Sequence, residues 1–219
     1  MTQKYNPKEK AENIISVSTK LFLEKGYEKT SVQDIVNATG ISKGAIFFHF
    51  KSKEDILHAV LNKQAAELHE TFSKWIAKLK KGNAREKIIA ILEKNLKETE
   101  PRAPLDSLIS SQMHNPRFIV ANIRDGVNHS APVIAQLLKE GVKDGSITTT
   151  SPDECAEAFF VLMNTWCDHE LFERDIDWLG KRMRYVQQIM KQMGADILSD
   201  KFIKEYIKHV EKMYKGSKK

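Results

Sequence analysis

The chain has 219 residues, of which 41% are hydrophobic and 29% are charged, and its formal net charge is +6. This composition supplies enough apolar material for a packed core and excludes a disordered protein. No eighteen apolar residues follow one another, and the polar segment 1–10 lacks the apolar core of a secretory signal, so we expect a cytoplasmic protein with no membrane partner.

The positive charge is concentrated near the amino terminus. Residues 1–53 hold nine lysines and five acidic residues, a net charge of +4, whereas residues 54–219 hold 26 basic and 24 acidic side chains. Neutralising phosphates releases bound counterions, so this asymmetry favours a nucleic-acid partner for the first quarter of the chain. Surface lysines also serve solubility, and charge alone does not decide between the two.

A supporting helix is predicted first. Apolar and small residues recur at steps of three and four from Ala11 to Phe22, which is the spacing of one helical face. Gly26 comes next and is expected to end the helix, because glycine readily adopts the backbone of a helix exit.

Two short helices and a tight turn come next. Ser31 and Asp34 have the spacing of a capping box, in which each side chain satisfies a free amide at a helix start. Gly40 is placed to form the turn, and Ser42 to cap a second short helix over residues 43–49.

The remainder is also predicted to be helical. Ser52 and Asp55 form another cap signal, and a long apolar pattern runs from there towards Gly82. Prolines and glycines divide the chain beyond Gly82, and no long alternating strand pattern occurs. The sequence therefore predicts an all-α protein. Its clearest later helices are predicted over residues 153–172, 179–193 and 202–213.

A supporting helix followed by two short helices and a tight turn matches the helix-turn-helix, whose last helix enters the major groove of DNA. Lys43 is placed to reach a base edge or a phosphate, and Gly44 and Ala45 let the backbone approach the duplex closely. We expect Ser31, Lys51 and Lys53 to contact phosphates and thereby set the register.

The segment TSVQDIVNATGISKGAIFFHFKSKEDIL, residues 30–57, resembles the signature of the TetR family of transcriptional regulators. The resemblance implies a homodimeric repressor with a helix-turn-helix domain at residues 1–53. It also implies a larger helical domain at 54–219 for dimerisation and ligand binding. Carried over by position, it implies DNA contacts from Thr30, Ser31, Ser42, Lys43, Gly44, Phe47, Phe48, His49 and Lys53.

The chain departs from the family pattern at Phe47 and Phe48, where tyrosine is usual at one or both positions. A tyrosine hydroxyl can bond a phosphate, so the phenylalanines lack one neutral hydrogen bond of about 0.5–1.5 kcal/mol. Core packing is an alternative role for Phe48 and for Phe50. For His49, the alternative to a phosphate contact or a capping role is burial.

One such domain makes too few contacts with DNA for selective binding, so we expect a dimer. Its two recognition helices should lie about 34–36 Å apart, or a multiple of that, on a palindromic operator. The predicted helices 153–172 and 179–193 are the expected dimer surface, because their apolar faces could bury one another in a four-helix arrangement. The alternative is that these apolar stripes form the core of the single chain.

A small-molecule effector is expected in the larger domain. Thioethers, flat aromatic rings and one imidazole are suited to lining a cavity between helices. The alternative for each candidate residue is an ordinary position in the core or on the surface. The candidate lining residues are Met113, His114, Phe118, Phe159, Met163 and Trp166.

An enzyme is the main rival class. Asp168, His169, Glu170 and Glu173 form an acidic and imidazole cluster, but the second histidine of a zinc hydrolase is missing, and a solvated helix end explains them better. The sequence also contains no phosphate-binding glycine loop and no nucleophile turn. We therefore expect no catalytic residues, no metal and no cofactor. A helical protein that only binds partners, and an activator in place of a repressor, remain open.

Overall fold

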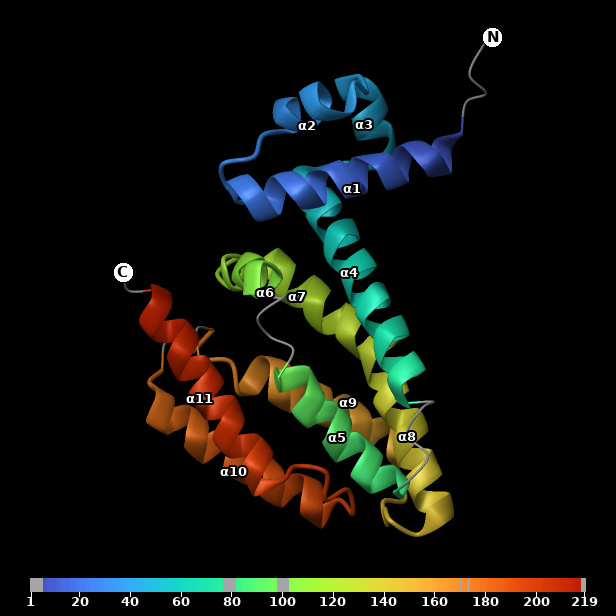
Figure 1. Cartoon of the computed structure of the whole chain (residues 1–219), viewed down its shortest axis with the longest axis vertical. Helices are drawn as coiled ribbons and strands as arrows, with labels where there is room; N and C mark the ends of the chain where they lie inside the picture. Colours follow the sequence, from blue (N-terminus) through green and yellow to red (C-terminus); the bar gives the residue numbers. More distant parts are fainter. Residues whose placement is uncertain (1–5, 77–81, 98–102, 170, 173, 218–219) are drawn as a thin grey trace. The chain divides into compact units, whose positions relative to one another are not determined.

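The structure, a computed structural model, describes residues 6–76, 82–97, 103–169, 171–172 and 174–217 (Figure 1). Every regular element in these ranges is a helix, which confirms the predicted all-α class. None of these helices is long and apolar enough to cross a membrane. The chain divides into an amino-terminal unit, residues 1–74 with 104–109, and a carboxy-terminal unit, residues 75–103 with 110–219.

The amino-terminal unit begins with the three predicted helices. α1 begins four residues earlier than the apolar pattern indicates, because the side chain of Asn6 caps it and Pro7 occupies its first turn. α1 packs against both α2 and α3. The elements of this unit are α1 (Pro7–Lys25), α2 (Val32–Thr39), α3 (Lys43–His49), most of α4 (Lys53–Ile76) and most of α6 (Ala103–Ser110).

One face of each helix builds the core of the amino-terminal unit. Ile14 and Phe22 of α1, Ile35 of α2, Ile46 of α3 and Leu57 of α4 are all at most 2% exposed. Burying a side chain of this size stabilises a fold by about 1.5–3 kcal/mol. The apolar face of each short helix therefore turns inward, and the opposite face of α3 is left outside.

The carboxy-terminal unit contains the remaining helices. α8 packs against α5 and α9, and α11 packs against α5 and α10. Two short π-helical segments continue α7 and α9 without a break. The elements are α5 (Ala84–Lys97), α7 (Pro116–Asp125), η2 (Gly126–Ser130), α8 (Ala131–Asp144), α9 (Pro152–Val161), η3 (Leu162–Trp166), α10 (Ile176–Gln192) and α11 (Asp200–Ser217).

The first π-helical segment, η2, packs against α9. A Cβ atom placed on Gly126 would lie 1.9 Å from the ring atoms Cε1 and Cζ of Phe160. Real atoms do not approach so closely, so glycine at 126 lets the aromatic ring lie directly against the helix backbone.

The predicted helix 153–172 ends earlier than expected. Regular structure stops at Trp166, and the chain then turns, with the carboxylate of Asp168 accepting a hydrogen bond from the amide of Leu171 at 2.7 Å. Glu170 and Glu173, the other acidic members of the predicted cluster, lie outside the described residues.

The apolar stripe of α10 belongs to the core of the single chain. Leu179, Met183, Val186 and Met190 are each 0% exposed, and they pack in one cluster with residues of α8, α9 and α11. The expectation that this stripe forms the dimer surface is therefore wrong, and the alternative interpretation of it is correct. Periodicity identified the apolar face of α10, but a single sequence does not tell which element covers that face.

The end of α10 approaches the loop at Thr148 and Thr149 very closely. Gly194 has φ = +81°, and a Cβ atom on it would lie 2.6 Å from the backbone nitrogen of Thr149. The Gly194 carbonyl accepts a hydrogen bond from the Thr148 amide at 2.8 Å. Gly145 has a similar φ of +77° but no heavy atom within 4 Å of a Cβ there.

We expect Gly194→Ala to destabilise the carboxy-terminal unit more than the matched Gly145→Ala. Both variants place a side chain at positive φ, which costs about 1–2 kcal/mol. Only Gly194→Ala adds a clash with backbone, worth about a further 1–3 kcal/mol. Urea unfolding followed by circular dichroism measures the difference, and equal losses would contradict the close approach of Gly194 to the loop.

Candidate DNA interface

The start of α2 is fixed by the predicted capping box. The hydroxyl oxygen of Ser31 accepts a hydrogen bond from the Asp34 amide at 3.1 Å, and the Asp34 carboxylate accepts one from the Ser31 amide at 2.8 Å. Lys25, at the end of α1, donates to the same carboxylate at 2.8 Å. The hydrogen bonds from Lys25 and Ser31 hold the pKa of Asp34 well below its usual range. Asp34 therefore stays ionised and ties α1 to α2.

The turn between α2 and α3 has the predicted form. Gly40 ends α2 with φ 68° and ψ 6°, a left-handed conformation that suits glycine. Its amide still donates to the Val36 carbonyl at 2.9 Å. The side chain of Ser42 then caps α3 by accepting a hydrogen bond from the Ala45 amide at 3.3 Å. These bonds fix the direction in which α3 leaves the turn.

The outer face of α3 is open. Lys43 is exposed, and a Cβ atom on Gly44 would meet no heavy atom within 4 Å. The rings of Phe47 and Phe48 are 40% and 74% exposed, so the alternative of core packing is wrong for Phe48. Phe50, the residue after α3, is half-buried. A basic side chain, accessible backbone and exposed aromatic rings thus lie on one short helix.

Thr30 and Lys53 have structural roles that the sequence did not reveal. Thr30 is 1% exposed, and its hydroxyl donates to the Gly26 carbonyl at 2.7 Å. The Lys53 ammonium donates to the carbonyls of Tyr27 and Thr30, at 3.0 and 3.1 Å, and lies 4.1 Å from the centre of the Tyr27 ring. Lys53 thus joins the start of α4 to the loop between α1 and α2. Its third ammonium proton is not used by these two bonds.

His49 lies against its aromatic neighbours. Its ring packs edge-on against Phe48, with centroids 5.3 Å apart. Its Nε2 atom is enclosed and has no hydrogen-bond partner among the residues that the structure describes.

The structure brings most predicted DNA contacts to α3 and the helix starts that flank it. Ala45, His49 and Lys53 are partly buried, and Thr30 is buried. Whether any of these residues touches DNA stays a prediction. The exposed members are Ser31, Ser42, Lys43, Gly44, Phe47, Phe48 and Lys51.

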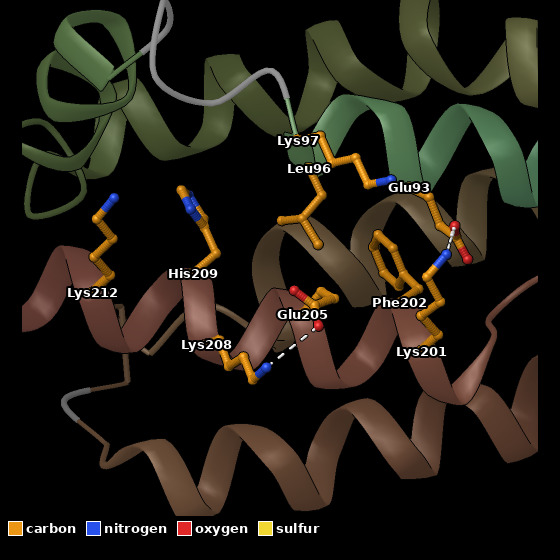
Figure 2. Close-up of a pocket in the computed structure, with 9 residues that line it drawn as sticks. All are labelled: Glu93, Leu96, Lys97, Lys201, Phe202, Glu205, Lys208, His209 and Lys212. Atoms are coloured by element: carbon orange, nitrogen blue, oxygen red, sulfur yellow. Dashed lines mark hydrogen bonds and ion pairs between the residues drawn. The ribbon is translucent and has the colours of Figure 1, made fainter.

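The six predicted ligand residues are more dispersed. Phe159 and Met163 belong to the core cluster of the carboxy-terminal unit, and Trp166 packs against it. Met113 and Phe118 are also buried, whereas His114 is exposed. A pocket between α5 and α11 (Figure 2) is lined by none of the six. Their contact with a ligand remains a prediction.

The predicted acidic and imidazole cluster holds no metal site that can be recognised in the described ranges. These ranges contain no group of three or more histidine, cysteine, aspartate or glutamate side chains placed to hold an ion.

The sequence profile of the family described as "Bacterial regulatory proteins, tetR family" matches residues 14–60, which run from α1 into α4 and include the whole of α2 and α3. This segment of the chain is similar to the tetR family. The matched segment contains every residue predicted above to contact DNA.

Known relatives match the chain mainly through the same region. YerO of Bacillus subtilis, an uncharacterized HTH-type transcriptional regulator, is 53% identical over 49 residues, which cover 22% of this chain and 17% of YerO. The HTH-type transcriptional regulator QacR of Staphylococcus aureus is 34% identical over 98 residues, which cover 45% of this chain and 50% of QacR. The chain thus spans at most half the length of these two relatives.

Solved structures share the fold over nearly the whole chain. A putative TetR-family transcriptional regulator of Mesorhizobium loti is 19% identical with a TM-score of 0.58, covering 95% of this chain and 96% of that protein. A putative TetR-family transcriptional regulator of Syntrophomonas wolfei is also 19% identical with a TM-score of 0.58. That match covers 89% of this chain and 100% of that protein. The fold that the chain shares with these proteins therefore extends beyond the helix-turn-helix into the carboxy-terminal helices.

We expect Lys53→Met to loosen the amino-terminal unit. The substitution keeps the length of the side chain but removes both hydrogen bonds to carbonyl oxygens. We therefore expect the unit to lose about 1–3 kcal/mol of stability. Hydrogen exchange of the amides in α1, α2 and α3 measures this loss.

The control is Lys51→Met, which removes the same charge from an exposed side chain two residues away. This substitution should change the stability of the amino-terminal unit by no more than about 0.5 kcal/mol. Equal protection in the two variants would mean that Lys53 does not hold the loop.

Proposed function

We propose that the protein is a cytoplasmic, homodimeric DNA-binding transcription regulator. In this proposal it is a repressor that reads a palindromic operator through α3 and responds to a small-molecule ligand. Residues 1–53 read the DNA, and residues 54–219 serve dimerisation and ligand binding. The observation that carries the proposal is the open outer face of α3, held on a buried inner face within a tetR-family domain.

The chemistry of α3 suits a DNA groove. Lys43 at its first position can donate to guanine acceptors or to a phosphate, and the backbone amides of the first turn attract an anion. Phe48 exposes 74% of its surface to water, which is unfavourable unless a partner covers it. A thymine methyl group or a deoxyribose would cover it.

The proposed dimer uses the outer faces of α9, η3 and α10 instead of their buried stripes. Tyr185 is 55% exposed and Phe172 is 39% exposed. Arg182 lies 4.1 Å from the Trp166 ring centre and 3.8 Å from that of Trp178, and it also donates to the Trp166 carbonyl. Tryptophan, tyrosine and arginine are the residue types that dominate binding energy at protein interfaces. This cluster supports homodimerisation through the predicted ranges 153–172 and 179–193.

Selection of bound sequences from a random duplex pool tests the proposed function. We expect an inverted repeat whose half-sites are about one helical turn, or a multiple of it, apart. Analytical ultracentrifugation of the same sample should give a dimer. Recovery of no sequence preference would overturn the proposal, because a nonspecific polyanion binder gives only salt-dependent affinity.

We expect Lys43→Ala to weaken binding to the selected operator by about 1–3 kcal/mol, which is roughly 5- to 150-fold. Helicity and dimerisation should be unchanged, since the side chain is exposed. Lys143→Ala removes the same charge from an exposed position on α8 and should leave operator affinity intact. Fluorescence anisotropy at fixed salt compares the two, and an equal effect of both would refute the assignment of α3.

Tyrosine at position 47 or 48 should preserve or improve binding. A hydroxyl on either exposed ring can donate to a phosphate, and one neutral hydrogen bond adds about 0.5–1.5 kcal/mol. We expect Phe47→Tyr and Phe48→Tyr to leave operator affinity unchanged or to raise it by up to about tenfold. A clear loss for either variant would show that its ring lies against an apolar surface in the complex.

A further inference from the structure

Gly44, the second residue of α3, is a glycine that the fold itself does not require. It has the backbone of an ordinary helical residue, since it is not among the glycines with positive φ. A Cβ atom placed on it would meet no heavy atom within 4 Å. Alanine stabilises a helix more than glycine does. The reason for glycine at this position therefore lies in what α3 contacts, and not in the packing of the chain.

Phe48 lies on the same face of α3 as Gly44. Residues four positions apart are neighbours on a helix surface, and a helical side chain leans towards the amino-terminal turn. The Phe48 ring therefore leans towards the turn that holds Gly44, yet it stays more than 4 Å from the place of a Cβ atom there. The two residues thus border an open gap, with helix backbone on one side and an aromatic ring on the other.

This gap faces away from the core of the amino-terminal unit. Ile46, midway between the two residues in sequence, is 0% exposed and marks the inner side of α3. Gly44 and Phe48 each lie two residues from it, which is about 200° around the helix, so both face outward. Phe48 is 74% exposed. The gap is therefore accessible to the surface on which α3 docks.

The size and chemistry of the gap suit a methyl group. Carbon atoms in contact lie about 3.5–4.0 Å apart, so the place of the missing Cβ atom admits one carbon without a clash. A glycine and a phenylalanine bring no polar side-chain atom to the gap, which favours an apolar occupant. In the major groove of DNA, the apolar group at the base edges is the C5-methyl group of thymine.

We propose that Gly44 and Phe48 recognise the C5-methyl group of one thymine in each half-site of the operator. The methyl group lies beside the Gly44 backbone and against the flank of the Phe48 ring. A hydroxyl at the far end of that ring leaves this contact in place, in agreement with the behaviour expected of Phe48→Tyr. The inference rests on the proposed function and deepens it, because it names the base feature that this pair of residues reads.

Replacement of thymine by uracil in the selected operator tests the proposal, because it removes only the methyl group. Each thymine of a half-site is replaced in turn, together with its counterpart in the other half-site, and binding is measured by fluorescence anisotropy at fixed salt. At one position we expect the loss of both methyl groups to weaken binding by about tenfold or more. 5-Bromouracil, whose bromine atom is similar in size to a methyl group, should restore binding at that position.

Gly44→Ala tests the gap. The added Cβ atom takes the place of the methyl group, so the variant should bind the thymine operator about tenfold or more weakly and should lose the preference for thymine over uracil. The urea midpoint of the variant without DNA should equal or exceed that of the parent protein, which excludes a folding defect. A preference for thymine that is unchanged in Gly44→Ala would overturn the proposal.

Phe48→Ala tests the ring, and Lys43→Ala is its control. Without the ring, the thymine and uracil operators should bind with nearly equal affinity. Lys43→Ala should weaken binding to both operators by the same factor and keep the preference for thymine, because the lysine does not border the gap. Loss of the preference in Lys43→Ala, or its retention in Phe48→Ala, would contradict the assignment to this pair of residues.

The duplex selection separates a failure of this inference from a failure of the proposed function. A pool that yields no operator would overturn both. A recovered palindrome that contains no thymine, or that binds equally well with uracil at every thymine position, would overturn only the recognition of the methyl group. DNA reading by α3 would then stand, and Gly44 and Phe48 would have no part in choosing the base.

Discussion

The burial of Ile46 is the contact on which the DNA-reading proposal depends. A helix of seven residues, such as α3, is too short to be stable alone in water, because its few hydrogen bonds do not offset the cost of its nucleation. Ile46 is 0% exposed, and α3 packs against α1 and α2. Burial of one face also orients the other, so the same contact that stabilises α3 presents Lys43 and Phe48 to solvent.

Local signals allowed much of the amino-terminal unit to be predicted. The reciprocal bonds of Ser31 and Asp34, the left-handed Gly40 and the cap at Ser42 all involve residues within a few positions of one another, so their spacing was readable. Lys53 shows the limit of such local signals. Its partners, Tyr27 and Thr30, are 26 and 23 residues away, and only the folded chain brings them to its ammonium group.

The carboxy-terminal unit was less predictable for the same reason. The stripe on α10 was correctly recognised as apolar, yet a single sequence could not tell burial within one chain from burial between two. Likewise, the pocket between α5 and α11 is lined by Glu93 and Lys201, which are 108 residues apart in the chain and 2.6 Å apart in space.

The contact between Gly126 and Phe160 limits how this fold can vary among proteins that share it. With ring carbons 1.9 Å from where a Cβ atom would stand, no side chain fits at 126 while the ring keeps its place. A smaller residue at 160 would remove this obstacle, and a larger one at 126 would then be tolerated. The two positions are therefore coupled across the helix pair, and an evolutionary change at one should accompany a compensating change at the other.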